Sequence, residues 1–149
     1  MTTFKGYQSA RPKQASDDCG NAFVDSNEVV ITANLTTADE VVLLEIPAGV
    51  DLHMFQLRAG DLDTGTTLVG NIGYRSLHPD AFETAAPTYF ASASAAFQAA
   101  QATWVDFVFA PKLFKEPVAI VFKPTTSATG LSGTPSIFTR ATGAVRGVV

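Results

Sequence analysis

The side chains that commonly perform catalysis or bind metals are few in this sequence and lie far apart along it. The chain holds two histidines, His53 and His78, and one cysteine, Cys19. Two isolated histidines do not supply the three or four ligands of a zinc site. Cys19 follows Asp17 and Asp18, and neighbouring carboxylates raise the pKa of a thiol, which weakens it as a nucleophile. We therefore expect neither a metal centre nor a cysteine nucleophile.

One acidic turn, Asp61-Leu62-Asp63-Thr64-Gly65, has the spacing that begins some calcium-binding loops. Gly65, however, stands where such a loop needs a third oxygen ligand, and strands rather than helices are expected on both sides. We expect a turn whose aspartates accept hydrogen bonds from nearby backbone N–H groups. A pair of glycosidase carboxylates remains a minor alternative. It is weakened because the chain has only one tryptophan that could stack on a sugar. The phosphate-binding glycine loops and the G-x-S-x-G hydrolase motif do not occur, so an enzyme is not expected.

Composition narrows the class of protein further. The chain has 149 residues, which is the length of one domain, and a net charge of −4. An acidic balance argues against a nucleic-acid partner. One cysteine excludes an internal disulfide, no apolar run is long enough for a membrane span, and the first residues contain no apolar signal segment. Charged residues make up only 16% of the chain, below the usual share of about 25%. This deficit predicts a soluble protein whose surface is partly covered by other chains.

Charge is distributed unevenly along the chain. Residues 1–16 contain three bases and no acid, for a net +3, whereas residues 17–63 contain one base and ten acids, for a net −9. We interpret residues 1–26 as an N-terminal arm and residues 27–149 as the folded domain. The arm is predicted to lie across a neighbouring subunit or another component of the assembly that the protein belongs to, the alternative being a terminus without a role. Its predicted contact residues are Phe4, Lys5, Tyr7, Arg11 and Lys13.

After residue 26 the pattern becomes one of short runs rich in β-branched and aromatic residues, separated by turn-forming Gly, Pro, Asn and Asp. Strands are predicted over residues 29–33, 40–46, 51–59, 66–75, 103–109, 116–123 and 136–142. Between them, residues 88–102 are rich in Ala, Ser and Gln, and the seven-residue spacing of Phe90, Phe97 and Trp104 predicts a short helix. The fold class is therefore all-β: a jelly-roll-like antiparallel sandwich with one short helical insertion and an extended N-terminal arm.

Two of the predicted strands are apolar on both faces. If Val42, Leu44 and Ile46 face the core, then Val41 and Leu43 point outward, and Trp104 and Val108 do the same in their strand. A sandwich strand of a monomer should instead alternate apolar with polar residues. Burial against further copies of the chain would explain the pattern, and cover by other segments of the same chain is the alternative. The predicted oligomer-interface residues are Val41, Leu43, Trp104 and Val108.

The central part of the sequence resembles small virion proteins of tailed bacteriophages. The likeness runs through the Pro47-Ala48-Gly49 turn, the Asp61-Leu62-Asp63-Thr64-Gly65 turn and Ile72-Gly73-Tyr74, and continues to Asp80-Ala81-Phe82 and Phe97-Gln98-Ala99-Ala100. Together these segments cover roughly residues 40–102. The resemblance implies a jelly-roll-like head decoration, or cement, protein, commonly a trimer on the outer surface of the capsid.

These observations lead to one main functional expectation and one alternative. The main expectation is a non-enzymatic virion protein, made in the host cytoplasm, that stabilises a phage capsid by bridging capsomers and binds the major capsid protein and its own copies as a homotrimer. The alternative is a receptor- or carbohydrate-binding sandwich of a spike or fibre, for which Tyr89, Phe90 and Asp80 are the candidate residues. Neither hypothesis requires a cofactor, a nucleic acid or a membrane.

Overall fold

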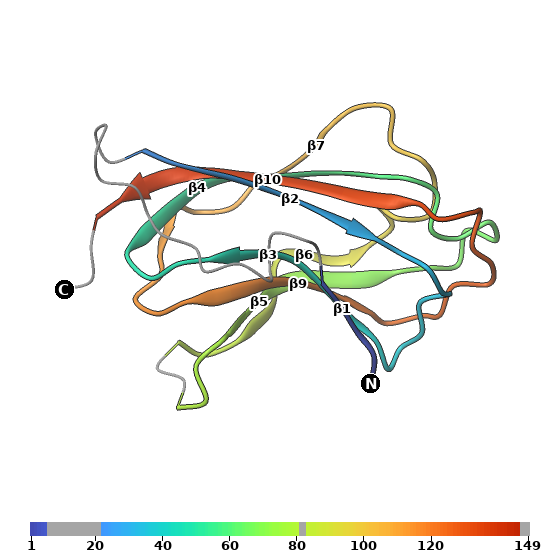
Figure 1. Ribbon diagram of the computed structural model, residues 1–149, viewed down its shortest axis with the longest axis horizontal. Helices are drawn as coiled ribbons and strands as arrows, with labels where there is room; N and C mark the ends of the chain where they lie inside the picture. The colour runs from blue at the N-terminus through green and yellow to red at the C-terminus, as the bar shows by residue number, and fades with distance from the viewer. Residues whose placement is uncertain (6–21, 81–82, 147–149) are drawn as a thin grey trace.

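The computed structural model describes residues 1–5, 22–80 and 83–146, and in these residues the chain forms two five-stranded sheets packed face to face (Figure 1). The first sheet has the order β1 (Thr3–Lys5), β3 (Glu40–Ile46), β9 (Val118–Pro124), β5 (Gly70–Ser76) and β6 (Ala86–Ser94). The second has the order β2 (Ala22–Val30), β10 (Ser136–Val145), β4 (Val50–Ala59) and β7 (Val105–Phe107), with β8 (Lys112–Leu113) also paired to β4. All pairings are antiparallel except β1 with β3. The predicted all-β sandwich is confirmed.

The predicted helix is wrong, because residues 86–94 form the edge strand β6 and the following residues form a turn. Both Phe90 in β6 and Phe97 in the turn are buried in the main core, and the ring centroid of Phe97 lies 4.2 Å from that of Phe122. The spacing of seven residues therefore arises from two separate segments that reach the same core. In the part of the chain that the structure describes, no helix is long and apolar enough to cross a membrane.

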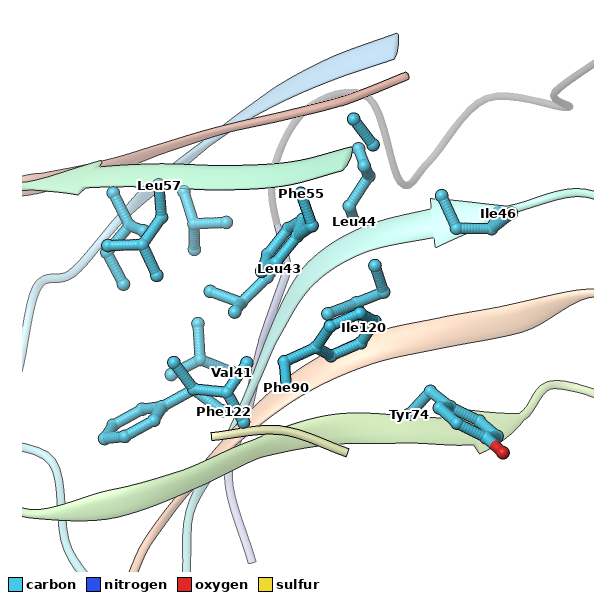
Figure 2. Packing of buried hydrophobic residues seen from close by; sticks show 14 of the residues in the cluster. Val41, Leu43, Leu44, Ile46, Phe55, Leu57, Tyr74, Phe90, Ile120 and Phe122 are labelled. Carbon is cyan, nitrogen blue, oxygen red and sulfur yellow. The ribbon is translucent and has the colours of Figure 1, made fainter. Parts of the chain in front are cut away.

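Strand β3 contains an extra residue that changes which side chains enter the core. Its register against β9 shifts between Val42 and Leu44, so Leu43 has no partner across the ladder. This bulge lets Val41, Leu43, Leu44 and Ile46 all pack between the sheets (Figure 2). Val42 instead joins Ala119 and Val121 in a separate apolar cluster. A β-bulge places two residues opposite one and so interrupts strict alternation.

The predicted outward position of Val41 and Leu43 is consequently wrong. Both side chains are completely buried within a single chain, so neither is available to a second copy. The apolar run of β3 reflects a bulged strand in the centre of a sandwich. It does not indicate a surface that another subunit covers.

The bulge also directs a backbone carbonyl into the core, where the opposite sheet provides its hydrogen-bond donors. The Leu43 oxygen accepts one hydrogen bond from Asn27 Nδ2 and another from Thr139 Oγ1, each at 2.9 Å. Asn27 lies on β2 and Thr139 on β10, and both are buried. An unpaired carbonyl at this position would cost about 1–3 kcal/mol. These two bonds therefore fix the second sheet against the bulge of the first.

The N-terminal boundary of the sandwich differs from the predicted one. Strand β2 begins at Ala22, so the boundary drawn after residue 26 falls inside a strand. Residues Thr3–Lys5 form β1, which pairs with Glu40–Val42 of β3, and the Phe4 side chain packs against the main core. Tyr7, Arg11 and Lys13 lie outside the described residues. The first residues of the predicted arm are thus an edge strand of their own domain.

We predict that removing both donors to the Leu43 oxygen costs more than the sum of the single changes. Asn27→Leu and Thr139→Val should each lower the free energy of unfolding by about 1 kcal/mol, because the second donor remains. The double variant leaves a buried carbonyl unpaired and should lose about 3 kcal/mol or more. Urea denaturation measures these values. Thr142→Val, the same change on the outer side of β10, is the control and should stay within about 0.5 kcal/mol; additive losses would contradict the prediction.

Candidate functional site

The structure separates the side chains that the sequence offers for catalysis. His53 Nε2 lies 3.3 Å from Asp51 Oδ2, and the same carboxylate oxygen forms an ion pair with Arg146, whose Nε lies 2.8 Å away. His78 lies in an exposed turn, where its Nδ1 accepts a hydrogen bond from the Asp80 backbone N–H at 3.2 Å. Cys19 lies outside the described residues, and among those described no three His, Cys, Asp or Glu side chains gather in a metal-binding group.

The acidic turn is built around one buried carboxylate rather than a cation. Asp63 is completely buried and accepts six hydrogen bonds, from the backbone N–H groups of Gly65, Thr67, Leu68 and Thr129 and from the hydroxyls of Thr67 and Thr129. Both carboxylate oxygens are therefore occupied by donors from the chain. The Asp61 side chain accepts a further bond from the Asp63 backbone N–H at 3.0 Å. The prediction of an aspartate-stabilised turn is confirmed.

The hydrogen bonds also determine the ionisation of Asp63. Burial alone would raise the pKa of this carboxyl, because a charge is poorly solvated inside a protein. The bonds from Thr129, Leu68 and Gly65 oppose burial and together hold the pKa well below its ordinary value. Asp63 is thus a structural anion, fully engaged with its own chain. It cannot serve as a proton donor near neutral pH.

The residues proposed for carbohydrate binding are largely internal. Phe90 is buried, and Tyr89 is half-buried with its hydroxyl donating to the Ala110 oxygen at 2.8 Å. Both rings belong to a cluster of edge-to-face, tilted and stacked aromatic contacts, which also contains Phe55, Tyr74, Phe107, Phe109 and Phe114. Asp80 lies in the separate exposed turn. A sugar-stacking platform needs exposed ring faces, and Tyr89 and Phe90 do not provide them.

One cation lies at the margin of this aromatic cluster. Lys112 Nζ is 3.1 Å from Glu83 Oε2 and lies 5.4 Å from the centre of the Tyr74 ring. Burial opposes the charge on Lys112, but the hydrogen bonds to Glu83 and Tyr74 outweigh it and raise the pKa of the ammonium group. Burial likewise raises the pKa of Tyr89. These groups stay in their ordinary protonation states near neutral pH and hold together the loops around β8.

The outer face of the second sheet is the strongest candidate for an interaction surface. Arg140 of β10 stacks over the Trp104 ring at 4.3 Å and donates from Nε to the Gln56 side chain. Beside it, Arg58 lies 5.4 Å from the centre of the Phe138 ring. Arginine and large aromatic side chains are enriched at the centres of protein interfaces. We call the set of Gln56, Arg58, Trp104, Phe138 and Arg140 the arginine–aromatic face.

The predicted interface residues fall into two groups. Trp104 is half-buried on the arginine–aromatic face, and Val108 is 97% exposed just beyond β7, at one edge of the same sheet. Val41 and Leu43 lie in the core, away from both. Sequence reasoning missed Val24 and Val30, which are 75% and 48% exposed on β2 at the opposite edge. The alternation of buried Phe23 and Val29 with these exposed valines is typical of a strand, whereas the predicted arm, residues 1–26, includes the first half of that strand.

Comparison with known proteins finds the same fold in two phage capsid chains. No protein-family model and no curated protein matches the sequence. Two solved structures match the fold over nearly the whole chain. A chain of the cyanophage Pam1 capsid asymmetric unit aligns with a TM-score of 0.66 and 20% identity, covering 93% of this chain and 95% of that one. A chain of the capsid of Ralstonia phage GP4 aligns with a TM-score of 0.72 and 18% identity, covering 99% of each.

We predict that Asp63→Asn destabilises the protein and flattens the acid side of its stability profile. The amide presents an NH₂ group to backbone N–H donors, so the loss at neutral pH should be about 2–4 kcal/mol. Because the folded-state pKa of Asp63 is lowered, the carboxylate stabilises the fold above the unfolded pKa, near pH 4. That contribution fades as pH falls toward the folded pKa.

Denaturant unfolding at a series of pH values tests this prediction. The wild type should lose stability more steeply below about pH 4 than Asp63→Asn does. Asp80→Asn, in the exposed turn, is the matched control and should leave stability at neutral pH unchanged within about 0.5 kcal/mol. Parallel profiles for wild type and Asp63→Asn would show that the carboxylate is not the source of the acid sensitivity.

Proposed function

We propose that this chain is a non-enzymatic structural protein of a bacteriophage virion. The observation that carries the proposal is the alignment over 99% of both chains with a component of the Ralstonia phage GP4 capsid, at a TM-score of 0.72. A second phage capsid chain shares the fold over almost the same extent. The contacts of the polar residues support a structural role. Asp63 accepts hydrogen bonds from its own chain, and the two histidines lie apart, His53 in β4 and His78 in an exposed turn.

Within the virion, the finer proposal is that the chain decorates the outer capsid surface and bridges capsomers, in contact with the major capsid protein. A single sandwich with one small contact holds weakly, but an oligomer that engages several symmetry-related sites at once binds with much greater avidity. The resemblance of the central turns to head decoration proteins supports this role. Synthesis in the host cytoplasm before attachment belongs to the same proposal.

The N-terminal segment is proposed to make one of these contacts. Phe4 packs against the core of its own sandwich and so anchors the start of the segment. We assign the outward contact to Lys5, Tyr7, Arg11 and Lys13, whose positive charge precedes the acidic stretch of residues 17–63. Exposed charges attract within a Debye length of about 8–10 Å. The contact should therefore steer attachment and weaken as salt is added.

The oligomer is proposed to be a homotrimer that buries Trp104 and Val108. An apolar side chain that is 97% exposed, as Val108 is, loses nothing within its own chain when it becomes covered by another. Trp104 lies on the adjoining arginine–aromatic face, stacked with Arg140. The three-fold symmetry follows from the resemblance to trimeric decoration proteins. The receptor- or carbohydrate-binding alternative gains no support, because Tyr89 and Phe90 are turned inward.

The virion role predicts that the chain is present in purified particles in stoichiometric amounts. Mass spectrometry of purified heads should identify it, and an electron cryomicroscopy map should place its two sheets outside the shell, across capsomer boundaries. Its N-terminal residues should face the major capsid protein or a neighbouring copy. Particles that lack the chain would refute the virion role. Density for the chain on the inner surface or in the tail would refute only the proposal that it decorates the outer surface.

The trimer predicts a selective effect of charge at Val108. Val108→Lys should convert the trimer to smaller species at micromolar concentration, because the lysine would be desolvated at the contact. The melting temperature of the subunit should change little, since the Val108 side chain is 97% exposed. Sedimentation velocity measures the effect, with Leu77→Lys in a different exposed turn as the control. A trimer that persists in Val108→Lys would remove Val108 from the interface.

A further inference from the structure

The two sheets have four edges, and three of them carry features that discourage pairing with another strand. Strand β1 has three residues, and the edge formed by β7 and β8 is divided into pieces of three and two residues. Strand β6 contains Pro87, two register shifts against β5, and Ala93 with a φ of 50°. Short strands, prolines and bulges are the devices by which proteins protect sheet edges.

The fourth edge, β2, has none of these three features, although it carries two carboxylates, Asp25 and Glu28. It runs for nine residues without proline or glycine, and its register with β10 is continuous from Ala22 to Val30. No strand pairs with its other side in the part of the chain that the structure describes. Val24 and Val30 are 75% and 48% exposed. A long, regular, partly apolar edge of this kind is a template for strand pairing.

The hydrogen bonds show which residues of β2 present their backbone to solvent. The N–H of Ile31 donates to the Pro135 oxygen at 3.0 Å, on the β10 side. Among the described residues, the Ser26 N–H donates instead to its neighbour Asp25 Oδ1 at 2.8 Å. Backbone N–H and C=O groups alternate in direction along a strand. Those of the odd-numbered residues therefore point toward β10, and those of the even-numbered residues point away from the sheet. The free edge therefore consists of Ala22, Val24, Ser26, Glu28 and Val30.

We propose that β2 pairs with β2 of a second copy of this chain, antiparallel and centred on Ser26. This register overlaps all nine residues, since Ser26 is the middle of the strand. It sets Val24 opposite Glu28 of the second copy, and Ala22 opposite Val30 of the second copy. Centring the pair on Glu28 would set the two Glu28 carboxylates directly opposite each other, which like-charge repulsion disfavours. Centring it on Asn27 would overlap fewer residues of the strand. The second sheets of the two copies then form one continuous sheet.

A second copy is the occupant that this edge suits without any other component. The two-fold pairing is isologous, so each exposed valine of one copy is covered by a residue already present in the other. The contact lies at the opposite edge of the sheet from Val108. It is therefore separate from the proposed trimer contact and does not depend on the virion role.

The sign of charge at residue 24 tests the register. In the Val108→Lys background, which removes the proposed trimer contact, the chain should form dimers. Val24→Glu would oppose Glu28 of the second copy and should raise the dimer dissociation constant about tenfold, because each dimer contains the pair twice. Val24→Lys would face the same carboxylate and should strengthen the dimer. Leu77→Glu and Leu77→Lys are the matched controls, and sedimentation velocity is the readout.

Cysteine cross-linking tests the two-fold axis directly. In a Cys19→Ser background, Ser26→Cys should form a disulfide-linked dimer under mild oxidation. Directly opposed residues of a hydrogen-bonded pair lie about 5.5 Å apart at Cα, within the range for a disulfide. Leu77→Cys is the control and should cross-link several-fold more slowly. Ser26→Pro should abolish the dimer while preserving the fold, because the Ser26 N–H is not used by β10.

A concentration-independent monomer in the Val108→Lys background would overturn the proposal. Equal weakening by Val24→Glu and Val24→Lys would overturn the Ser26-centred register, and cross-linking no faster than the Leu77→Cys control would overturn the axis. Absence of the chain from virions would refute the function proposed above but leave this contact standing. Dimers that form in solution but are missing from the particle would support the β2 contact as a property of the free protein.

Discussion

The ionised carboxylate of Asp63 is the interaction on which one whole end of the sandwich depends. Four of its six hydrogen bonds come from Asp63's own connection between β4 and β5. The two from Thr129 join that connection to the one between β9 and β10. Both connections cross from one sheet to the other. The β2–β3 connection meets them, because the Ala128 N–H donates to the Leu35 oxygen. A charge that is buried and fully hydrogen-bonded thus replaces the regular ladder where the chain changes sheets.

The bulge in β3 plays the corresponding part in the middle of the sandwich. It brings Leu43 and Leu44 into the core together and turns the Leu43 carbonyl toward Asn27 and Thr139 of the other sheet. The two sheets are therefore joined by directed bonds as well as by apolar packing. With the interior closed in this way, the surfaces left for function are the edges of the sheets and the arginine–aromatic face.

Several features could be predicted from local sequence because they depend on neighbouring residues. Two strands, Glu40–Ile46 and the one that begins at Ser136, are predicted by their β-branched and apolar residues. The Asp61-x-Asp63-x-Gly65 turn is predicted by its turn-forming residues. The predicted helix failed for the opposite reason. Phe90 and Phe97 belong to a strand and a turn, and only their common position in the core connects them.

The sequence by itself determined the all-β class, the absence of the catalytic motifs searched for and the low content of charged residues. These properties depend only on composition and on patterns among neighbouring residues. Only the tertiary structure decided which apolar residues face inward. Val41 and Leu43 could be placed only once the bulge against β9 was known, and Val24 and Val30 only once β2 was found at an unpaired edge. Register and edge position arise from pairing between segments far apart in the chain. A single unpaired residue moves every following side chain to the other face, so patterns within one strand do not contain that information.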